Sequence, residues 1–424
     1  MNKIENYLSN RKGILYLEEC SALDLARKFG TPLYVYSEAR ISENYQRLFN
    51  AFSRHYKKFR IHYSIKANDS LAILKILQKL GSAADCSSPA EIYLAKKAGI
   101  KVLIYSGIYY DSNDLQYGIK NNVKINMDNA DKLKLLSDSG VREICFRVNP
   151  GIGNGKFNQI VTSGKEAKFG MIEQALLDAY KKAKNLGFQK FGIHMMTGSC
   201  IIEGDYFEKI TGVLMDIAGK ISKEAGILFD YIDIGGGFGI PYEPGEKELD
   251  IEKVASNVIK VFREKLKEYD LGEPWLLVEP GRYIEGDTAV LLTKVTSIKK
   301  RPKHFIGIDS GMNTLIRPML YHAYHEILLA NNLNAEKKDK IDIVGQICES
   351  TDIFTKDRIM PEIKENDILA ILNAGAYGFS MSSTYGCKPR PAEVLVSANN
   401  VDLIRKRQEI QDLAETQIVP ERLR

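Results

Sequence analysis

Strand-length apolar runs alternate with longer amphipathic stretches between about residue 59 and residue 282. Between the runs, apolar residues recur every three or four positions, as in Leu71, Leu74 and Leu77, which is typical of helices that bury one face. A strand followed by a helix, repeated in this way, predicts parallel strands and favours a closed (β/α)₈ barrel over an open doubly wound sheet. The eight predicted strands cover residues 61–65, 83–86, 102–105, 124–127, 144–148, 192–196, 231–234 and 276–278.

The pattern changes after Arg282, where the helical period fades and strand-like runs follow one another closely. This change predicts a second, mostly β domain. We therefore expect an α/β protein with a barrel domain over residues 31–282 and a β domain over residues 283–424 that also takes in residues 1–30. The strands predicted in the second domain cover residues 289–297, 305–309, 341–347, 368–372 and 392–396.

Composition agrees with two globular domains and excludes several other classes of protein. The 424 residues exceed the size at which one hydrophobic core usually stops growing, and 44% hydrophobic with 27% charged residues is ordinary for a globular chain. The net charge of +5 is spread over helix-like stretches, so we expect no nucleic-acid partner. We also expect no membrane span, since no apolar run approaches about 18 residues. The six cysteines lack Cys-x-x-Cys spacing, which favours a reduced, cytoplasmic protein.

Polar residues follow the predicted barrel strands, each at or just after the end of its strand. Barrel enzymes keep their chemistry at the carboxyl ends of the strands, so these positions predict an active site at one mouth of the barrel. The residues are Lys66, Asp85, Ser106, Asn126, Asn149, Ser199, Gly235 and Glu279.

Two of these positions suggest a phosphorylated aldehyde cofactor. A lysine at a strand mouth, such as Lys66, can be partly desolvated, and its free amine can then form an imine with an aldehyde. Gly235, Gly236 and Gly237 follow the seventh predicted strand, where many barrels bind phosphate through backbone N–H groups. The alternatives are that Lys66 is an ordinary surface lysine and that the three glycines only form a tight turn.

An acid and a thiol complete this set of reactive groups. Glu279, four residues beyond Trp275 and three before Arg282, can keep a pyridine nitrogen protonated, although a Glu–Arg ion pair is the alternative. Cys348 lies beside Glu349 in a polar run, although an inert buried cysteine is the alternative. We expect no metal, because the six histidines form no known ligand spacing.

With these motifs the chain resembles the fold type III pyridoxal-phosphate decarboxylases, and among them the diaminopimelate decarboxylases, over nearly its whole length. The resemblance implies pyridoxal 5'-phosphate as the cofactor, bound through an imine to Lys66, and Cys348 as the thiol that returns a proton to the product. It implies a homodimer in which the β domain of one subunit contributes to the active site of the other. The implied cofactor-binding residues are Lys66, His194, Met196, Ser199, Gly235, Gly236, Gly237, Glu279, Arg282 and Tyr377.

The expected reaction is the decarboxylation of meso-diaminopimelate to L-lysine and CO₂. This substrate carries a second amino-acid centre, so its distal carboxylate needs guanidinium groups and its distal ammonium needs a carboxylate. Ornithine would need no distal arginine. The resemblance implies that the substrate-binding residues are Arg282, Arg317, Tyr321, Glu349 and Tyr377.

Three positions depart from the pattern of these decarboxylases. Met196 stands where a histidine usually stacks on the cofactor ring, Thr351 replaces a common glycine, and Thr384 begins a run that replaces Asn-Tyr-Asn. The alternatives are a related decarboxylase acting on an ornithine-like or carrier-linked amino acid, or a non-enzymatic pyridoxal-phosphate carrier. Such carriers are single-domain proteins, which argues against the last alternative for a chain of this length.

Overall fold

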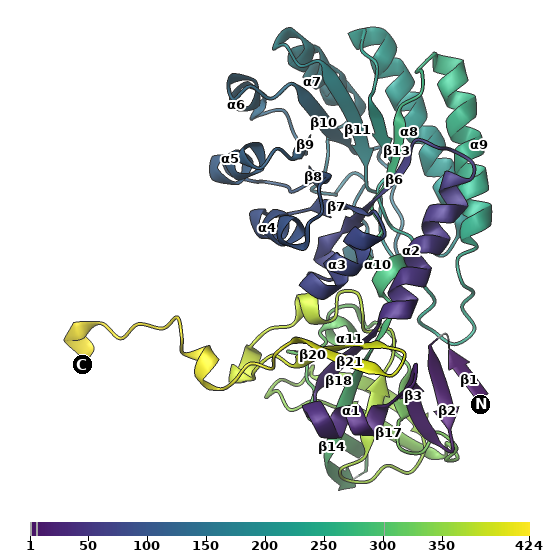
Figure 1. The fold of residues 1–424 in the computed structure, drawn as a ribbon, viewed down its shortest axis with the longest axis vertical. Helices are drawn as coiled ribbons and strands as arrows, with labels where there is room; N and C mark the ends of the chain where they lie inside the picture. The colour runs from purple at the N-terminus through teal and green to yellow at the C-terminus, as the bar shows by residue number, and fades with distance from the viewer. Residues whose placement is uncertain (1, 6, 301) are drawn as a thin grey trace. The chain divides into compact units, whose positions relative to one another are not determined.

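The computed structural model describes residues 2–5, 7–300 and 302–424, and the chain divides into two compact units (Figure 1). The barrel unit comprises Ser42–Ile284. The β unit comprises Met1–Ile41 together with Glu285–Arg424.

The barrel unit is built on eight parallel strands that close on themselves, which confirms the predicted (β/α)₈ barrel. Closure is made by pairing of β13 with β6 and of β10 with β9. The strands are β6 (Phe59–Ser64), β7 (Ala83–Cys86), β8 (Leu103–Tyr105), β9 (Lys124–Met127), β10 (Glu143–Val148), β11 (Lys190–Met195), β12 (Tyr231–Asp233) and β13 (Trp275–Val278).

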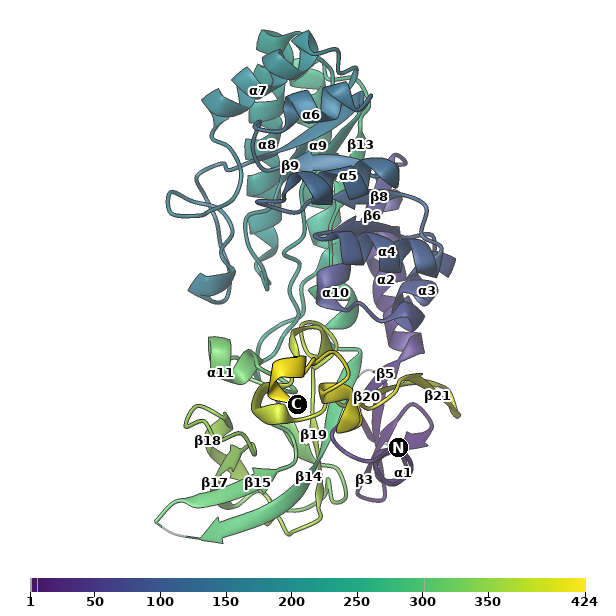
Figure 2. The ribbon, with the colours of Figure 1, turned by 90° about the vertical axis from the view of Figure 1, so that its left-hand side faces the viewer.

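Helices lie outside the barrel strands, as Figures 1 and 2 show. Local signals set their ends: α4 begins after Ser88, whose hydroxyl accepts a hydrogen bond from the Glu91 N–H, and ends at Gly99, whose φ of 90° is left-handed. The helices are α2 (Glu38–Ser53), α3 (Leu71–Lys79), α4 (Pro89–Ala98), α5 (Ser112–Lys120), α6 (Leu133–Asp138), α7 (Glu173–Asn185), α8 (Gly204–Ala225), α9 (Ile251–Tyr269) and α10 (Arg282–Glu285). Short 3₁₀ turns are η1 (Ile65–Ala67) and η2 (Asn158–Ile160).

Alternate residues of each strand face the inside of the barrel, because successive side chains of a strand point to opposite faces. Near the carboxyl ends of the strands the inward residues are polar, and they include Ser64, Asp85, His194, Asp233 and Glu279. All five are buried. This polar layer lines the mouth at which the sequence predicts the active site.

An apolar layer closes the middle of the barrel. Ile104, Cys145, Tyr231 and Leu277 form one buried cluster inside it. Gly192 makes room for this layer, since a Cβ at that position would collide with the Tyr231 ring. The layer separates the polar mouth from the amino-terminal ends of the strands.

The β unit contains a small sheet in the order β1–β2–β3–β4 and a larger one in which β14 pairs with β5, β15 and β19. The mostly β character predicted for this part of the chain is confirmed. Its strands are β1 (Asn2–Glu5), β2 (Leu8–Arg11), β3 (Ile14–Leu17), β4 (Cys20–Ser21), β5 (Leu33–Ser37), β14 (Ala289–Lys300), β15 (His304–Ile308), β16 (Ile327–Leu329), β17 (Asp339–Val344), β18 (Ile353–Met360), β19 (Ile368–Ile371), β20 (Ala392–Ser397) and β21 (Asn400–Arg405). Its helices and 3₁₀ turns are α1 (Ala22–Phe29), α11 (Arg317–Tyr321), η3 (Phe379–Met381), η4 (Tyr385–Cys387), η5 (Gln411–Leu413) and η6 (Glu421–Leu423).

The structure differs from the sequence prediction at the start of the barrel domain, which was placed at residue 31. Strand β5 belongs to the β unit, where it pairs with β14 on one side and β20 on the other. Leu33 and Val35 are fully buried in the apolar core between this sheet and α1. Strand β5 is therefore a central strand of the β unit. Local periodicity does not predict this pairing, because it joins residues far apart in sequence.

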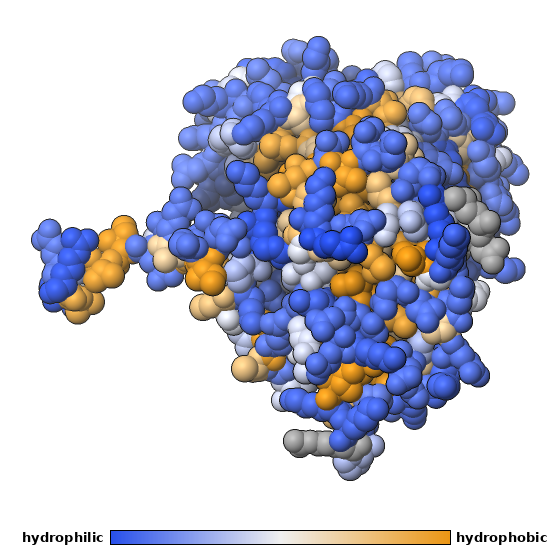
Figure 3. Space-filling view, turned by 60° about the horizontal axis from the view of Figure 1, so that its bottom comes forward, coloured by the Kyte–Doolittle hydropathy of each residue, from blue (hydrophilic) through white to orange (hydrophobic). Residues whose placement is uncertain are grey.

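The last residues of the β unit carry exposed apolar side chains. Ile410 is 77% exposed and Ile418 is 87% exposed, and Val419 and Leu423 are also largely exposed. The projecting segment carries orange, hydrophobic atoms in Figure 3. Among the described residues, none of the helices has both the length and the apolar character that crossing a bilayer requires.

Candidate active site

Lys66 and Asp85 form an ion pair at the mouth of the barrel. Lys66 lies in η1, directly after β6, and its Nζ is 2.9 Å from Oδ2 of Asp85 at the end of β7. The Asp85 side chain is fully buried, whereas that of Lys66 is 41% exposed. Asp85 also accepts hydrogen bonds from the hydroxyls of Ser64 and Ser106. A carboxylate fixed by two hydroxyls therefore orients an amine that remains accessible from the mouth.

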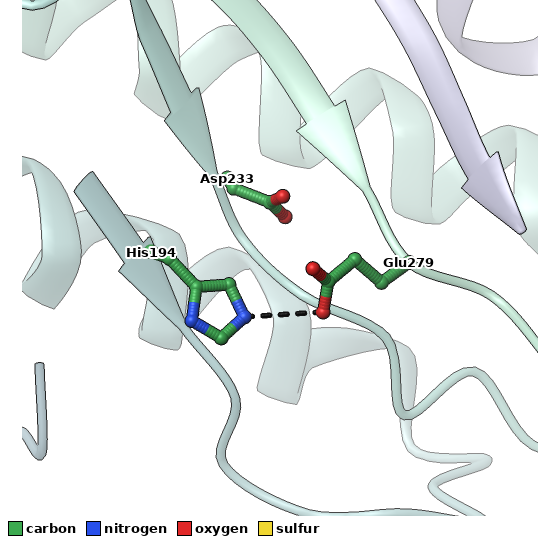
Figure 4. Close-up of side chains that lie close together, drawn as sticks. All are labelled: His194, Asp233 and Glu279. Carbon is green, nitrogen blue, oxygen red and sulfur yellow. Dashed lines mark hydrogen bonds and ion pairs between the residues drawn. The ribbon is translucent and has the colours of Figure 1, made fainter. Parts of the chain in front are cut away.

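Three further titratable side chains converge at the ends of β11, β12 and β13 (Figure 4). Nε2 of His194 is 3.1 Å from Oε2 of Glu279, and both side chains are buried. Oε1 of Glu279 is buried and has no hydrogen-bond partner. Asp233 accepts a hydrogen bond from the Gly235 N–H through Oδ1, while its buried Oδ2 has no partner.

The two carboxyl groups of this cluster have pKa values shifted in opposite directions. Burial, and then the negative charge of Glu279, raise the pKa of Asp233 well above its ordinary value. Burial also acts to raise the pKa of Glu279, but His194, Lys66 and Arg147 outweigh it and the pKa is lowered. Glu279 therefore stays ionised at neutral pH, whereas the environment of Asp233 favours its neutral form.

Gly235, Gly236 and Gly237 make a turn in which side chains are excluded. A Cβ at Gly235 would collide with the carbonyl oxygen of Met195, and a Cβ at Gly236 would collide with that of Glu279. Gly235 and Gly237 also have φ values of 72° and 94°, which favour glycine. The turn thus packs closely against the neighbouring strand ends, with the N–H groups of Gly235 and Gly236 donating to Asp233 Oδ1 and Met196 Sδ.

Met196 packs against this turn. Its Sδ accepts a hydrogen bond from the Gly236 N–H at 3.2 Å, and its carbonyl accepts one from Thr162 Oγ1. His194, two residues earlier, faces Glu279 inside the barrel. The two predicted residues therefore occupy different places: His194 holds the buried carboxylate, and Met196 borders the glycine turn.

Arg282 and Ser199 also meet at the mouth. Arg282 is buried in the first turn of α10, and its guanidinium donates to the hydroxyl of Tyr242 at 2.9 Å and to Ser199 Oγ at 3.4 Å. A glutamate–arginine pair between Glu279 and Arg282 was the alternative reading of the sequence. The hydrogen-bond partner that the structure gives Glu279 is His194.

Sequence reasoning assigned no role to Arg147, which is buried near the end of β10. Its guanidinium lies over the Phe169 ring at 4.5 Å and donates to the carbonyl of Met196 at 3.3 Å. Burial lowers its pKa, against the effect of nearby acids including Glu279 and Asp85. The sequence did hold a signal for Arg147, and likewise for Asp85: each is a charged residue inside an otherwise apolar strand.

The other predicted site residues belong to the β unit. Cys348 and Glu349 are exposed on the loop after β17, which ends at Val344 and so does not extend to residue 347 as predicted. Asp352 fixes this loop, because its buried carboxylate accepts hydrogen bonds from the N–H groups of Ile347 and Met312. The anchoring leaves the Cys348 thiol at the surface of its unit.

Arg317, Tyr321 and Tyr377 lie elsewhere in the β unit. Arg317 begins α11 and is only 1% exposed, with Nη1 2.9 Å from His325 Nε2. Tyr321 ends the same helix and is half-buried. Tyr377 is half-buried and has a φ of 56°, a left-handed conformation that is rare for a tyrosine and often marks a functional position.

His194, Asp233 and Glu279 are also the group of potential metal ligands found among the described residues, with donor atoms within 4.8 Å of one another. Their spacing in sequence did not reveal this cluster.

Comparison with known proteins identifies the class of this barrel. Residues 39–286 match the family described as pyridoxal-dependent decarboxylase, pyridoxal binding domain. The chain belongs to this family, which confirms the predicted enzyme class and its pyridoxal phosphate cofactor.

The relatives that match nearly the full length of the chain are diaminopimelate decarboxylases. The diaminopimelate decarboxylase of Methanothermobacter thermautotrophicus is 46% identical, with 98% of each chain covered. That of Archaeoglobus fulgidus is 37% identical, covering 97% of this chain and 99% of the relative. The crystal structure of the M. jannaschii diaminopimelate decarboxylase in complex with L-lysine is 34% identical, with a TM-score of 0.91 and 99% of each chain covered.

The residues of the barrel mouth fit pyridoxal phosphate. The glycine turn could hold the phosphate, the accessible Lys66 amine could hold the aldehyde carbon, and the unpartnered Glu279 Oε1 could accept a hydrogen bond from the ring nitrogen. These three features are observed in the barrel unit itself.

Substitution of Gly235 by alanine tests the glycine turn. We expect the affinity for pyridoxal phosphate to fall roughly tenfold or more, since the turn must shift to clear the Met195 carbonyl. Titration of the cofactor-free protein, followed by absorbance, measures this. Gly272→Ala is the matched control, because its φ of 68° imposes similar strain in open space. Equal affinities in the two variants would contradict a phosphate-binding role for the turn.

Proposed function

We propose that this protein decarboxylates meso-diaminopimelate to L-lysine and CO₂. The observation that carries the proposal is the likeness to diaminopimelate decarboxylases over essentially the whole chain, joined to a barrel mouth whose residues fit pyridoxal phosphate. Pyridoxal phosphate supplies the electron sink that stabilises the electron pair left on the substrate carbon when CO₂ departs.

The barrel unit binds and orients the reacting groups. Lys66 provides the amine that would hold the aldehyde carbon of pyridoxal phosphate, and Asp85 orients that amine. Ionised Glu279 keeps a negative charge at the buried end of the mouth, and His194 fixes its carboxylate by hydrogen bonding. Gly235, with its two glycine neighbours, leaves room for the phosphate.

Further residues of the mouth complete the proposed cofactor site. Met196 borders the glycine turn and offers a thioether that can cover an aromatic ring. Ser199 and Arg282 form a hydrogen-bonded pair that can turn toward an anion. We assign Tyr377 of the β unit to the phosphate as well.

We propose that the substrate's distal amino-acid centre is recognised by Arg282, Arg317, Tyr321, Glu349 and Tyr377. Guanidinium groups suit the distal carboxylate and Glu349 suits the distal ammonium. The buried hydrogen bond between Arg317 and His325 supports a fixed guanidinium, since His325 Nδ1 lies 2.7 Å from the Leu372 carbonyl.

A side-by-side assay of CO₂ release from meso-diaminopimelate, ornithine, lysine and arginine tests the proposed substrate. We expect kcat/KM for diaminopimelate to exceed that for ornithine by roughly 10³-fold or more, because an unfilled polar site rejects a substrate that lacks the matching group. Faster CO₂ release from ornithine would instead favour a related decarboxylase that acts on an ornithine-like amino acid. Met196, Thr351 and Thr384, which depart from the usual pattern of diaminopimelate decarboxylases, are compatible with that alternative.

Cys348 is proposed to return the proton to the substrate carbon through its exposed thiol. Cys348→Ala should bind pyridoxal phosphate normally and lower kcat by roughly 10²-fold or more, the usual effect of losing a general acid. Single-turnover kinetics and cofactor absorbance measure the two effects separately. Cys387→Ala removes the other exposed thiol and should leave kcat unchanged. An unchanged rate in Cys348→Ala would exclude the thiol from the reaction.

We propose that the active protein is a cytoplasmic homodimer in which one subunit supplies Cys348 to the active site that contains Lys66 of the other subunit. The exposed apolar residues of the C-terminal segment, Ile410, Ile418, Val419 and Leu423, support association, and all six cysteines are free, as a reducing compartment requires.

Mixing inactive Lys66→Ala with slow Cys348→Ala protein should restore activity, since a mixed dimer has one intact site. Failure of exchanged mixtures to regain activity would contradict a shared site.

A further inference from the structure

A cavity lies in the barrel unit at the amino-terminal ends of the strands, on the other side of the apolar middle layer from the mouth. Its volume is about 210 Å³. Besides the acids Glu143 and Asp230, its lining includes six basic or aromatic residues: Arg60, His62, Lys124, Lys190, Tyr231 and Trp275. Of these six, Lys124, Lys190, Tyr231 and Trp275 are the first residues of their strands. The cavity takes no part in the proposed decarboxylation.

The cavity carries excess positive charge. Three cationic side chains line it, against the carboxylates of Glu143 and Asp230. Lys124 is paired with Glu143, and Asp230 accepts a hydrogen bond from the Phe191 N–H. Arg60 and Lys190 are in no ion pair within the part of the chain that the structure describes. One guanidinium group, of Arg60, and one ammonium group, of Lys190, are therefore available to an anion.

His62 is an unsatisfied polar group in the wall of this cavity. It is 1% exposed, and neither ring nitrogen has a hydrogen-bond partner. Burial, with help from the charge of Arg60, lowers its pKa to about 3, so the ring is neutral and carries one N–H donor at physiological pH. Buried polar groups are normally paired, and a bound oxygen acceptor would satisfy this donor.

The other walls of the cavity are aromatic and apolar. The Arg60 guanidinium lies over the Trp275 ring at 4.4 Å, and Lys124 Nζ lies 4.9 Å from the centre of the Tyr231 ring. Leu277 adds an aliphatic surface. These walls suit a ligand with a short hydrocarbon body better than a fully polar ion such as phosphate.

We propose that this cavity is a binding site for a small carboxylate with a short apolar body. Its carboxylate group would bind between Arg60 and Lys190 and accept a hydrogen bond from His62, and its hydrocarbon part would contact Trp275 and Leu277. Barrels usually use this end for stability. Arg60 and Lys190, opposed by the single carboxylate of Asp230, lie beside a buried, unpartnered imidazole, and this arrangement distinguishes the cavity from a structural end.

Trp275 is the only tryptophan of the chain, so its fluorescence reports directly on the cavity. The full-length holoenzyme would be titrated with sodium butyrate, sodium phosphate and butylammonium chloride at constant ionic strength. We expect a saturable change in emission with butyrate and none with butylammonium. No saturable change with butyrate, or tighter binding of phosphate than of butyrate, would overturn the proposal.

Variants separate this site from other carboxylate-binding positions. Arg60→Gln combined with Lys190→Gln should weaken butyrate binding roughly tenfold or more, measured by calorimetry because the Arg60 change also alters the surroundings of Trp275. The matched control combines Arg54→Gln with Lys101→Gln, which removes the same charges at exposed positions that do not line the cavity. If the double variant fails to fold, Lys190→Gln alone serves, since Lys190 is exposed. Equal affinity in the cavity variant and the control would refute the site.

Discussion

Lys66→Ala is expected to abolish both decarboxylation and the visible absorbance of bound pyridoxal phosphate. We propose Lys66 as the amine that binds the cofactor's aldehyde, and Asp85, 2.9 Å away, orients it at the mouth. No other lysine of the described barrel unit is in an ion pair with Asp85. We expect kcat/KM to fall by roughly 10³-fold or more, as for the loss of a nucleophile that acts in every turnover.

Absorbance spectra and CO₂ release, measured on the same preparations, test this expectation. The matched control is Lys79→Ala, which removes an exposed lysine from the last turn of α3 and should alter neither reading. A Lys66→Ala protein that keeps both the absorbance and the activity would remove this lysine from the mechanism. Loss of activity with retained absorbance would show that another amine binds the cofactor.

Glu279→Gln should lower kcat by roughly 10²-fold or more while the protein still binds pyridoxal phosphate. The substitution keeps the shape of the side chain but removes the negative charge that we propose holds a proton on the ring nitrogen. The effect should be large because the carboxylate is buried, where a charge interacts more strongly than in water. Steady-state kinetics and cofactor titration measure the two properties.

Asp233→Asn is the matched comparison for Glu279→Gln. Both carboxyl groups are buried in the same cluster, but the pKa of Asp233 is raised and that of Glu279 is lowered. An asparagine resembles the neutral acid, so we expect kcat to fall less than about tenfold. If Asp233→Asn were the more damaging substitution, the assignment of the ionised and neutral carboxyl groups would be reversed.

Much of the fold could be predicted because its signals are local. The eight barrel strands occur where apolar runs predicted them, with ends that differ by at most two residues. Strand β18 was missed, because Thr355, Lys356 and Asp357 make it polar and it is ordered by pairing with β17. Strand β5 was assigned to the wrong unit for a similar reason: its neighbours in the sheet are residues 289–292 and 392–396.

The candidate site could be predicted in part. Lys66 and Glu279 stood out as polar residues at the ends of apolar strands, and the glycine turn stood out by composition. Asp85 and Arg147 carried the same signal, but their contribution depends on partners from other strands. The contact between His194 and Glu279 joins residues 85 apart in sequence.

The sequence by itself determined the strand–helix repeat, the change to a β unit and the chemical groups available at the strand ends, because these depend on neighbours along the chain. The tertiary structure alone decided which of those groups meet. Closure of the barrel places His194, Asp233 and Glu279 together and buries them, and this burial, with the charges it brings close, shifts the pKa values of the two acids in opposite directions. The same closure encloses Arg60, His62 and Lys190 around a cavity at the other end.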